Sequence, residues 1–301
     1  MTLRSNLDLF IHCMRFTHVL HSLALLVVLP ALATTAPPAT ITSATTGAPI
    51  PYASLSIQNK PISTVADGFG HFAINQFSLA ATTDTLVITC VGYIPRKVLM
   101  ADLDNLNELQ LTPQAQSLAE VVVQSPRWQR HRIGRDGAWG ITYYNFHLQV
   151  DKEPAHKLGR EVGAILHVQP GSYIEDAHFY VGQNNFKNVR FRLNVRALDA
   201  EDHPAASLLT RDVQVAVPNR TTGWQHIDLK QYDVKVGPNK RVAVTLEWLD
   251  GVPDGQRSWY CLMVPAAMSA THRMVFRDKS EDQWKVQPLN LSLYVTTLSP
   301  K

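Results

Sequence analysis

The chain has 301 residues, of which 45% are hydrophobic and 18% charged, and a formal net charge of +3 at pH 7. This small positive excess excludes the strongly basic surface of a nucleic-acid-binding protein, and there is no block of acidic residues that would form a solvated tail. The length is sufficient for two domains of ordinary size.

Residues 1–33 have the three parts of a secretory signal peptide. Arg4 and Arg15 supply positive charge, an apolar run extends from Val19 to Leu29, and Ala31-Leu32-Ala33 is a small-x-small cleavage site. The run is shorter than the roughly 20 apolar residues that span a bilayer. We therefore expect an exported protein of the periplasm, outer membrane or cell surface, with no integral membrane span in the mature chain.

Residues 40–124 contain short apolar runs between turn residues and almost no helix signal. The run at 53–57 alternates apolar residues with serines, and further runs follow at 86–88, 98–100 and 109–111. This spacing of short strands predicts a small β-sandwich.

Several motifs in this segment follow one another in a recognisable order. They are Pro49 within Thr46–Ile57, the spaced residues Thr64, Asp67, Gly70 and Phe72, and then Val91-Gly92-Tyr93. In these motifs the segment resembles the carboxypeptidase-regulatory-like domain family, and Leu118–Val123 resembles the strand that follows this domain in many Bacteroidetes-type proteins. The resemblance implies a transthyretin-like or prealbumin-like β-sandwich without catalytic residues, often found in outer-membrane receptors and surface proteins.

The chemistry of the hairpin residues agrees with this resemblance. Asp67 can accept hydrogen bonds from the turn backbone, Gly70 can adopt a positive φ, and Phe72 can anchor the next strand in the core. A calcium-binding role for Asp67 is less favoured because the neighbouring carboxylates of a calcium loop are missing.

Residues 125–138 are rich in arginine and are predicted to form a basic linker between domains. The favoured interpretation is a solvated linker, because four arginines over nine residues produce only a modest field. The alternative is a patch for an acidic partner such as a lipopolysaccharide phosphate or an anionic glycan, with Arg127, Trp128 and Arg130 as binding candidates.

Residues 139–298 resume the β pattern with longer strands. Apolar and polar residues alternate at 191–196 and 242–248, whereas 259–264 is apolar on both faces, as in a central strand. With about eight to ten strands, this domain is predicted to be a larger, jelly-roll-like β-sandwich, which makes the fold class all-β. The run 161–166 fits a short helix or a strand.

No motif of a catalytic, metal or phosphate site is present in the sequence. His167 and His178 could converge with Glu175 or Asp176 across two strands, but lone histidines on strands are usually surface or core residues. We therefore expect no metal, no cofactor and no enzymatic activity. Outside the signal segment the cysteines are Cys90 and Cys261, which we expect to be unpaired buried thiols.

The six tryptophans all lie beyond residue 127, and aromatic side chains can bind sugars by stacking. Trp139, Tyr144 and Trp284 lie in polar surroundings and are the best candidates for exposed binding residues, although packing is their alternative role. Trp248 is expected in the core. The sequence favours a non-catalytic binding or assembly module of the envelope, with a glycan or another envelope protein as partner. The alternative is a hydrolase of glycan or peptide with a site in the C-terminal sandwich.

Overall fold

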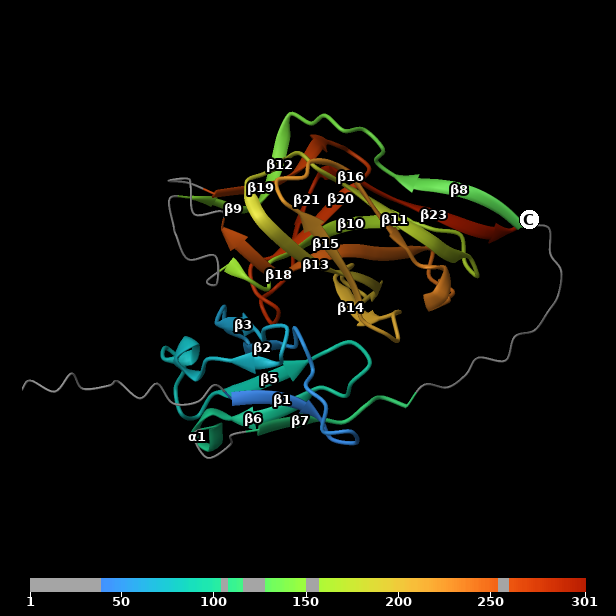
Figure 1. Ribbon diagram of the computed structural model, residues 1–301. Helices are drawn as coiled ribbons and strands as arrows, with labels where there is room; N and C mark the ends of the chain where they lie inside the picture. The colour runs from blue at the N-terminus through green and yellow to red at the C-terminus, as the bar shows by residue number, and fades with distance from the viewer. Residues whose placement is uncertain (1–38, 104–107, 116–127, 150–156, 254–259) are drawn as a thin grey trace, which may run out of the picture. The chain divides into compact units, whose positions relative to one another are not determined.

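The computed structural model describes residues 39–103, 108–115, 128–149, 157–253 and 260–301 (Figure 1). Almost all regular structure within these ranges is β-strand, so the predicted all-β fold class is confirmed. Within the same ranges, no helix has the length and apolar character needed to cross a membrane. The proposed signal segment, Leu118–Val123 and Arg127 lie outside the described residues.

The first sandwich consists of two sheets with a shared apolar core. One sheet has the order β4-β1-β7, and the other has the order β3-β2-β5-β6. The elements are β1 (Ala39–Ser43), β2 (Ser54–Ile57), β3 (Ser63–Val65), β4 (His71–Phe72), the 3-10 helix η1 (Ile74–Phe77), β5 (Thr85–Thr89), β6 (Arg96–Leu99), α1 (Met100–Leu103) and β7 (Glu108–Leu111). The closing strand β7 runs parallel to β1, and the other strand pairs are antiparallel.

The predicted hairpin is instead a tight turn that leads from β3 in one sheet to β4 in the other, because β3 pairs with β2 and β4 pairs with β1. The turn residues themselves act as their chemistry predicts. Oδ1 of Asp67 accepts hydrogen bonds from the backbone N–H groups of Phe69 at 2.8 Å and His71 at 2.9 Å. Gly70 has a φ of +76°, and a Cβ at this position would lie 2.8 Å from the carbonyl oxygen of Ile41. Phe72 is buried in the core of the sandwich. The turn therefore requires both the carboxylate of Asp67 and the absence of a side chain at Gly70.

The remaining motif residues lie at strand ends of the same sandwich. Pro49 forms an isolated bridge with Thr42, and Tyr93 forms one with Pro113. Gly92 has a φ of +86°, which favours glycine at this turn, and the ring of Tyr93 packs against the core. The motifs thus specify where strands begin and end.

The second sandwich contains three antiparallel sheets. A seven-stranded sheet has the order β14-β13-β18-β10-β20-β21, with β15 also paired to β13. A five-stranded sheet has the order β16-β11-β23-β8, with β17 paired to β11, and a four-stranded sheet has the order β12-β19-β22, with β9 paired to β19. The elements are β8 (Trp128–Gly134), β9 (Thr142–Gln149), β10 (Glu161–His167), β11 (Tyr173–Val181), β12 (Gln183–Asn184), β13 (Phe186–Leu198), β14 (Pro204–Ser207), β15 (Val213–Pro218), β16 (Gly223–Asp228), the 3-10 helix η3 (Lys230–Tyr232), β17 (Val234–Lys235), β18 (Arg241–Pro253), β19 (Tyr260–Met268), β20 (Arg273–Arg277), β21 (Lys285–Gln287), β22 (Leu289–Leu291) and β23 (Leu293–Pro300).

The core of this sandwich is built from the inward residues of its sheets. β13 and β18 are 13 residues each and pair along most of their length, which buries the predicted alternating residues. Trp248 is fully buried, as expected. The run 161–166 is a strand, and its Gly163 allows the close approach of β18, since a Cβ there would clash with the carbonyl oxygen of Val244.

The predicted basic linker is not a linker over its central part. Residues 128–134 form β8, which pairs with β23 along its whole length, from Trp128↔Pro300 to Gly134↔Tyr294. Ile133 packs against the core while the arginines on the other face remain exposed. Charged side chains are compatible with an edge strand that is solvated on one side.

Cys90 and Cys261 are both free, with Cys261 buried and Cys90 partly exposed.

Candidate functional site

Many aromatic and charged side chains lie together on the outward side of the sheet β16-β11-β23-β8. We call this surface the aromatic face. It is formed by Trp128, Arg130, Arg132, Tyr173, Glu175, Asp176, His178, Tyr180, Trp224, His226 and Tyr294. The opposite side of the same strands supplies apolar residues to the core.

A β-bulge in β11 explains why so many side chains share this face. β11 pairs with β23 in register up to Ile174 and again from Asp176, which leaves Glu175 as the extra residue. A bulge shifts the alternation of side chains by one position. Tyr173 and Glu175 before the shift, and Asp176 and His178 after it, therefore all point outward, whereas Ile174 is buried.

The rings of the aromatic face contact one another across strands. Tyr294 stacks on His178 with a centroid distance of 4.4 Å, and the guanidinium of Arg132 lies 4.7 Å above the Tyr294 ring. Trp224 meets Tyr294 edge-on at 5.1 Å and Tyr180 at 5.4 Å. Such cross-strand contacts fix the ring orientations before any ligand arrives.

The other end of the face combines a second aromatic pair with an ion pair. Trp128 is 39% exposed and meets Tyr173 edge-on at 5.8 Å. Nε of Arg130 donates to Oε2 of Glu175 at 2.7 Å, and Nη2 donates to Oε1 at 3.2 Å. This bidentate pair links β8 to β11 and places polar groups beside the exposed indole.

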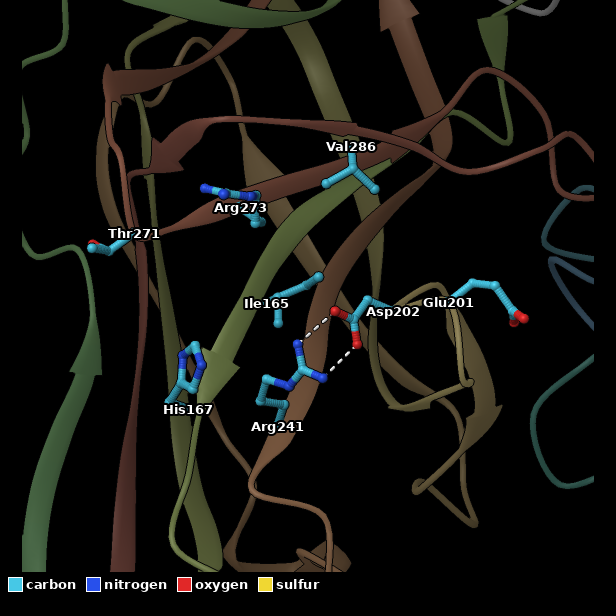
Figure 2. Close-up of a pocket in the computed structure, with 8 residues that line it drawn as sticks. All are labelled: Ile165, His167, Glu201, Asp202, Arg241, Thr271, Arg273 and Val286. Atoms are coloured by element: carbon cyan, nitrogen blue, oxygen red, sulfur yellow. Dashed lines mark hydrogen bonds and ion pairs between the residues drawn. The ribbon is translucent and has the colours of Figure 1, made fainter.

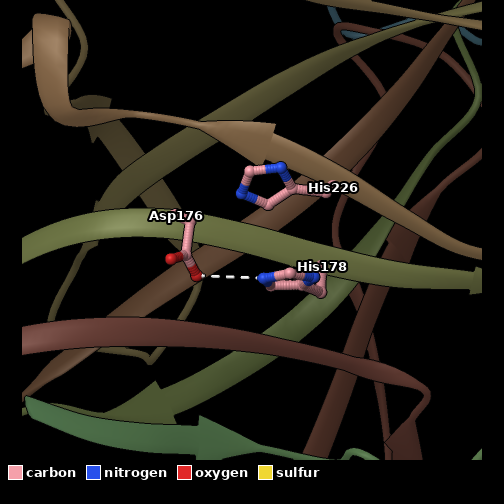
Figure 3. A group of neighbouring side chains, drawn as sticks. All are labelled: Asp176, His178 and His226. Carbon is pink, nitrogen blue, oxygen red and sulfur yellow. Dashed lines mark ion pairs between the residues drawn. The ribbon is translucent and has the colours of Figure 1, made fainter.

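Asp176, His178 and His226 form a compact polar group on this face (Figure 3). One ligand atom from each lies within 4.8 Å of the others, and Oδ1 of Asp176 is 3.1 Å from Nε2 of His178. Burial lowers the pKa of His178 below its ordinary value; Asp176 opposes this effect, whereas His226 and Arg132 reinforce it. His178 is therefore mainly neutral near pH 7, with a ring nitrogen available as a lone-pair donor.

A shallow hollow of about 410 Å³ lies elsewhere, on the seven-stranded sheet (Figure 2). Its lining residues are Ile165, His167, Glu201, Asp202, Arg241, Thr271, Arg273 and Val286. Arg241 holds both carboxylate oxygens of Asp202, at 2.6 Å and 2.5 Å, and Figure 2 shows Glu201 pointing away from Asp202. The two acids thus do not form the facing pair that a glycosidase requires.

The structure separates the residues that the sequence proposed for binding. Trp128 and Arg130 lie on the aromatic face, and Arg127 lies outside the described residues. Trp139 is 85% exposed but is not on this face, and Trp284 is partly buried with the Arg277 guanidinium 4.5 Å from its ring centre.

The expected exposure of Tyr144 is wrong. Its side chain is only 8% exposed and packs against Phe146 at 5.1 Å and Phe276 at 5.7 Å. Its polar sequence neighbours do not indicate exposure because adjacent residues of β9 point to opposite sides of the sheet. Burial raises the pKa of the Tyr144 hydroxyl well above its ordinary value.

Most residues of the aromatic face were not singled out from the sequence. The pairing of His167 with His178 is wrong, because His167 lies on β10 and lines the hollow. His178 instead faces His226, its directly registered partner on β16. The period-two pattern of His178 and Tyr180 was a usable signal, but only the strand register shows what lies opposite.

Comparisons with known proteins identify the first sandwich. Residues 40–123 match the model of the CarboxypepD_reg-like domain, which confirms the resemblance seen in the sequence. No curated protein matches the chain.

Similar solved structures include the cysteine protease and lectin-like domains of Cwp84, a surface layer associated protein of Clostridium difficile, at 5% identity and a TM-score of 0.37. This match covers 82% of the present chain and 58% of the other. A clostridial Cwp84 cysteine protease after propeptide cleavage matches at 6% identity and a TM-score of 0.35, covering 81% and 56%. The present chain thus spans less than two thirds of either protein, and similarity at this level carries no argument about function.

Proposed function

We propose that this protein is a non-catalytic, exported binding module of the cell envelope, and that it binds a glycan on the aromatic face. The observation that carries this proposal is the set of four at least partly exposed aromatic side chains on one side of one sheet, Trp128, Tyr173, Tyr180 and Trp224. The buried ring of Tyr294 packs between them and supports Trp224. The export signal and the envelope location are part of the proposal and rest on the sequence of residues 1–33.

The chemistry of the aromatic face suits a sugar chain. Aromatic rings offer rigid apolar surface to the C–H faces of pyranose rings, and neighbouring polar groups can hydrogen-bond the hydroxyls. From Tyr173 to Tyr180, β11 extends for roughly 20 Å, which is long enough for several consecutive sugar units. The Arg130–Glu175 pair and the histidines supply donors and acceptors along this path.

The face has features of a binding surface and no arrangement typical of a hydrolase. Among its described residues, Glu175 is held by Arg130, Asp176 lies beside His178, and Asp228 accepts the backbone N–H of Lys230, so each of these carboxylates is already engaged by a neighbouring group. Its rings are already fixed by mutual contacts, which lowers the entropic cost of binding.

The proposal is tested by screening the purified full chain against an oligosaccharide and lipopolysaccharide array and titrating the hits by calorimetry in the presence of a chelator. We expect Trp128→Ala and Trp224→Ala each to weaken binding by about tenfold or more, as for central aromatic contacts. Trp139→Ala and Trp284→Ala are matched controls that remove tryptophans from outside the face and should bind as wild type. Absence of glycan binding, loss of binding only in the controls, or turnover of the glycan would overturn the proposal.

A further inference from the structure

Two strands of the aromatic face place identical residues opposite each other at neighbouring positions. His178 pairs with His226, and Asp176 pairs with Asp228, in the antiparallel register of β11 and β16. The carboxylates of Asp176 and Asp228 are like charges, and like charges that face each other directly across a ladder are unfavourable in the absence of a counter-charge. A cation between these strands would offset that repulsion, and two imidazoles and a carboxylate are ligands suited to a first-row transition metal.

From this arrangement we infer that Asp176, His178 and His226 form a binding site for a divalent transition-metal ion of the zinc class. The inference runs against the sequence-based expectation of no metal, and it does not depend on glycan binding. Three protein ligands would leave a further coordination position open to water or to a ligand oxygen.

The distances are compatible with metal coordination after small movements. A central point between three atoms no more than 4.8 Å apart lies at most about 2.8 Å from each, whereas zinc–nitrogen bonds are about 2.0–2.1 Å long. The His226 side chain is exposed and can close this difference by rotation. His178 is held by its stacking on the ring of Tyr294, so the movement falls to His226.

The carboxylate adds an independent observation. Oδ1 of Asp176 is buried and accepts no hydrogen bond within the described part of the chain, although Nε2 of His178 lies 3.1 Å away. This nitrogen and this oxygen therefore already lie close enough to each other to bind one ion between them. Asp228, whose Oδ1 accepts the backbone N–H of Lys230 at 3.0 Å, contributes negative charge beside the site.

The test is a calorimetric titration of the chelator-treated full chain with zinc chloride in the absence of glycan. We expect saturable uptake of one equivalent, and Co²⁺ in place of Zn²⁺ should give visible absorption bands of a low-coordinate site. His226→Gln and Asp176→Asn should each weaken zinc binding by at least about tenfold, since even the loss of groups that only orient a ligand has effects of this size. His226 is exposed, so its replacement leaves the packing intact, which circular dichroism will verify.

His167→Gln is the matched control, because this histidine lies on β10 outside the site. It should bind zinc like the wild type. Absence of saturable zinc binding, or undiminished binding by both His226→Gln and Asp176→Asn, would overturn the inference. Because glycan binding is measured with a chelator and zinc binding without glycan, the failure of one proposal leaves the other open to its own test.

Discussion

Replacement of Glu161 by Gln removes a fully buried negative charge from a polar cluster in the seven-stranded sheet. The Glu161 carboxylate accepts hydrogen bonds from Nε and Nη2 of Arg277 at 2.9 Å and 2.6 Å, from Nδ2 of Asn194 at 2.9 Å, and from the hydroxyl of Thr245. The guanidinium of Arg196 lies 3.5 Å away. Because these groups are arranged to bind a carboxylate, the Glu161 side chain stabilises the native state only while it is ionised.

The magnitude follows from the pKa of this carboxyl. Burial by itself raises the pKa of Glu161, but Arg277 and Arg196, together with the hydrogen bonds from Thr245 and Arg277, lower it from 4.5 to about 2. The difference corresponds to about 3 kcal/mol of unfolding free energy. Because the native pKa is the lower one, this contribution is complete above pH 4.5 and is lost as the pH falls from 4.5 towards 2, with about 2 kcal/mol lost by pH 3.

Urea unfolding at pH 7 and pH 3, followed by tryptophan fluorescence, measures both the loss of stability caused by the substitution and the dependence of stability on pH. The six tryptophans all lie beyond residue 127, so the signal reports on the second sandwich. We expect Glu161→Gln to be about 3 kcal/mol less stable than wild type at pH 7 and to lose about 2 kcal/mol less between pH 7 and pH 3. Asp136→Asn, which breaks the exposed pair with Arg132, is the control and should behave as wild type. Equal losses of stability for wild type and Glu161→Gln on acidification would refute the reasoning.

Two further substitutions test the cores of the two sandwiches. Gly70→Ala should destabilise the first sandwich by about 1–3 kcal/mol, because a positive φ is strained for alanine and the new Cβ meets the Ile41 carbonyl. Gly47 has a similar φ of +67°, but a Cβ there would have nothing within 4 Å. Gly47→Ala should therefore lower the melting temperature less than Gly70→Ala when both are measured by calorimetry. Trp248→Ala should destabilise the second sandwich by about 3–5 kcal/mol, whereas Trp139→Ala at an 85% exposed position should change the urea midpoint little. Equal effects within either pair would contradict the packing described above.

The parts of the fold that follow local chemistry could be predicted from the sequence. The turn at Asp67 and Gly70 depends on a carboxylate that accepts hydrogen bonds from its own turn and on a positive φ, both of which are properties of single residues. The placement of the flanking strands in two different sheets is not a local property, which is why the predicted hairpin was wrong. The long strands β13 and β18 could be predicted because their apolar residues alternate over many positions. Both features are determined by residues that are close to one another in the chain.

The strand β8 was missed because an edge strand needs little apolar pattern. Of its residues, Ile133 packs against the core, while Arg130 and Arg132 remain in contact with solvent on the outer side. A run of this kind has the composition of a linker, and only its pairing with β23 distinguishes the two. Trp128 and Arg130, which the sequence proposed as binding residues, therefore lie on a defined surface, and the residues around them in the sequence could not indicate it.

The candidate site could not be assembled from the sequence because it depends on register and on one extra residue. His178 and His226 are far apart in the chain and meet only through the pairing of β11 with β16. Without the bulge at Glu175, strict alternation would turn Tyr173 inward whenever His178 points outward. The bulge thus allows the aromatic pair at one end of β11 and the histidine pair at the other to share one face. A single unpaired residue thereby determines whether a glycan and a metal ion could be bound on the same side of the sheet.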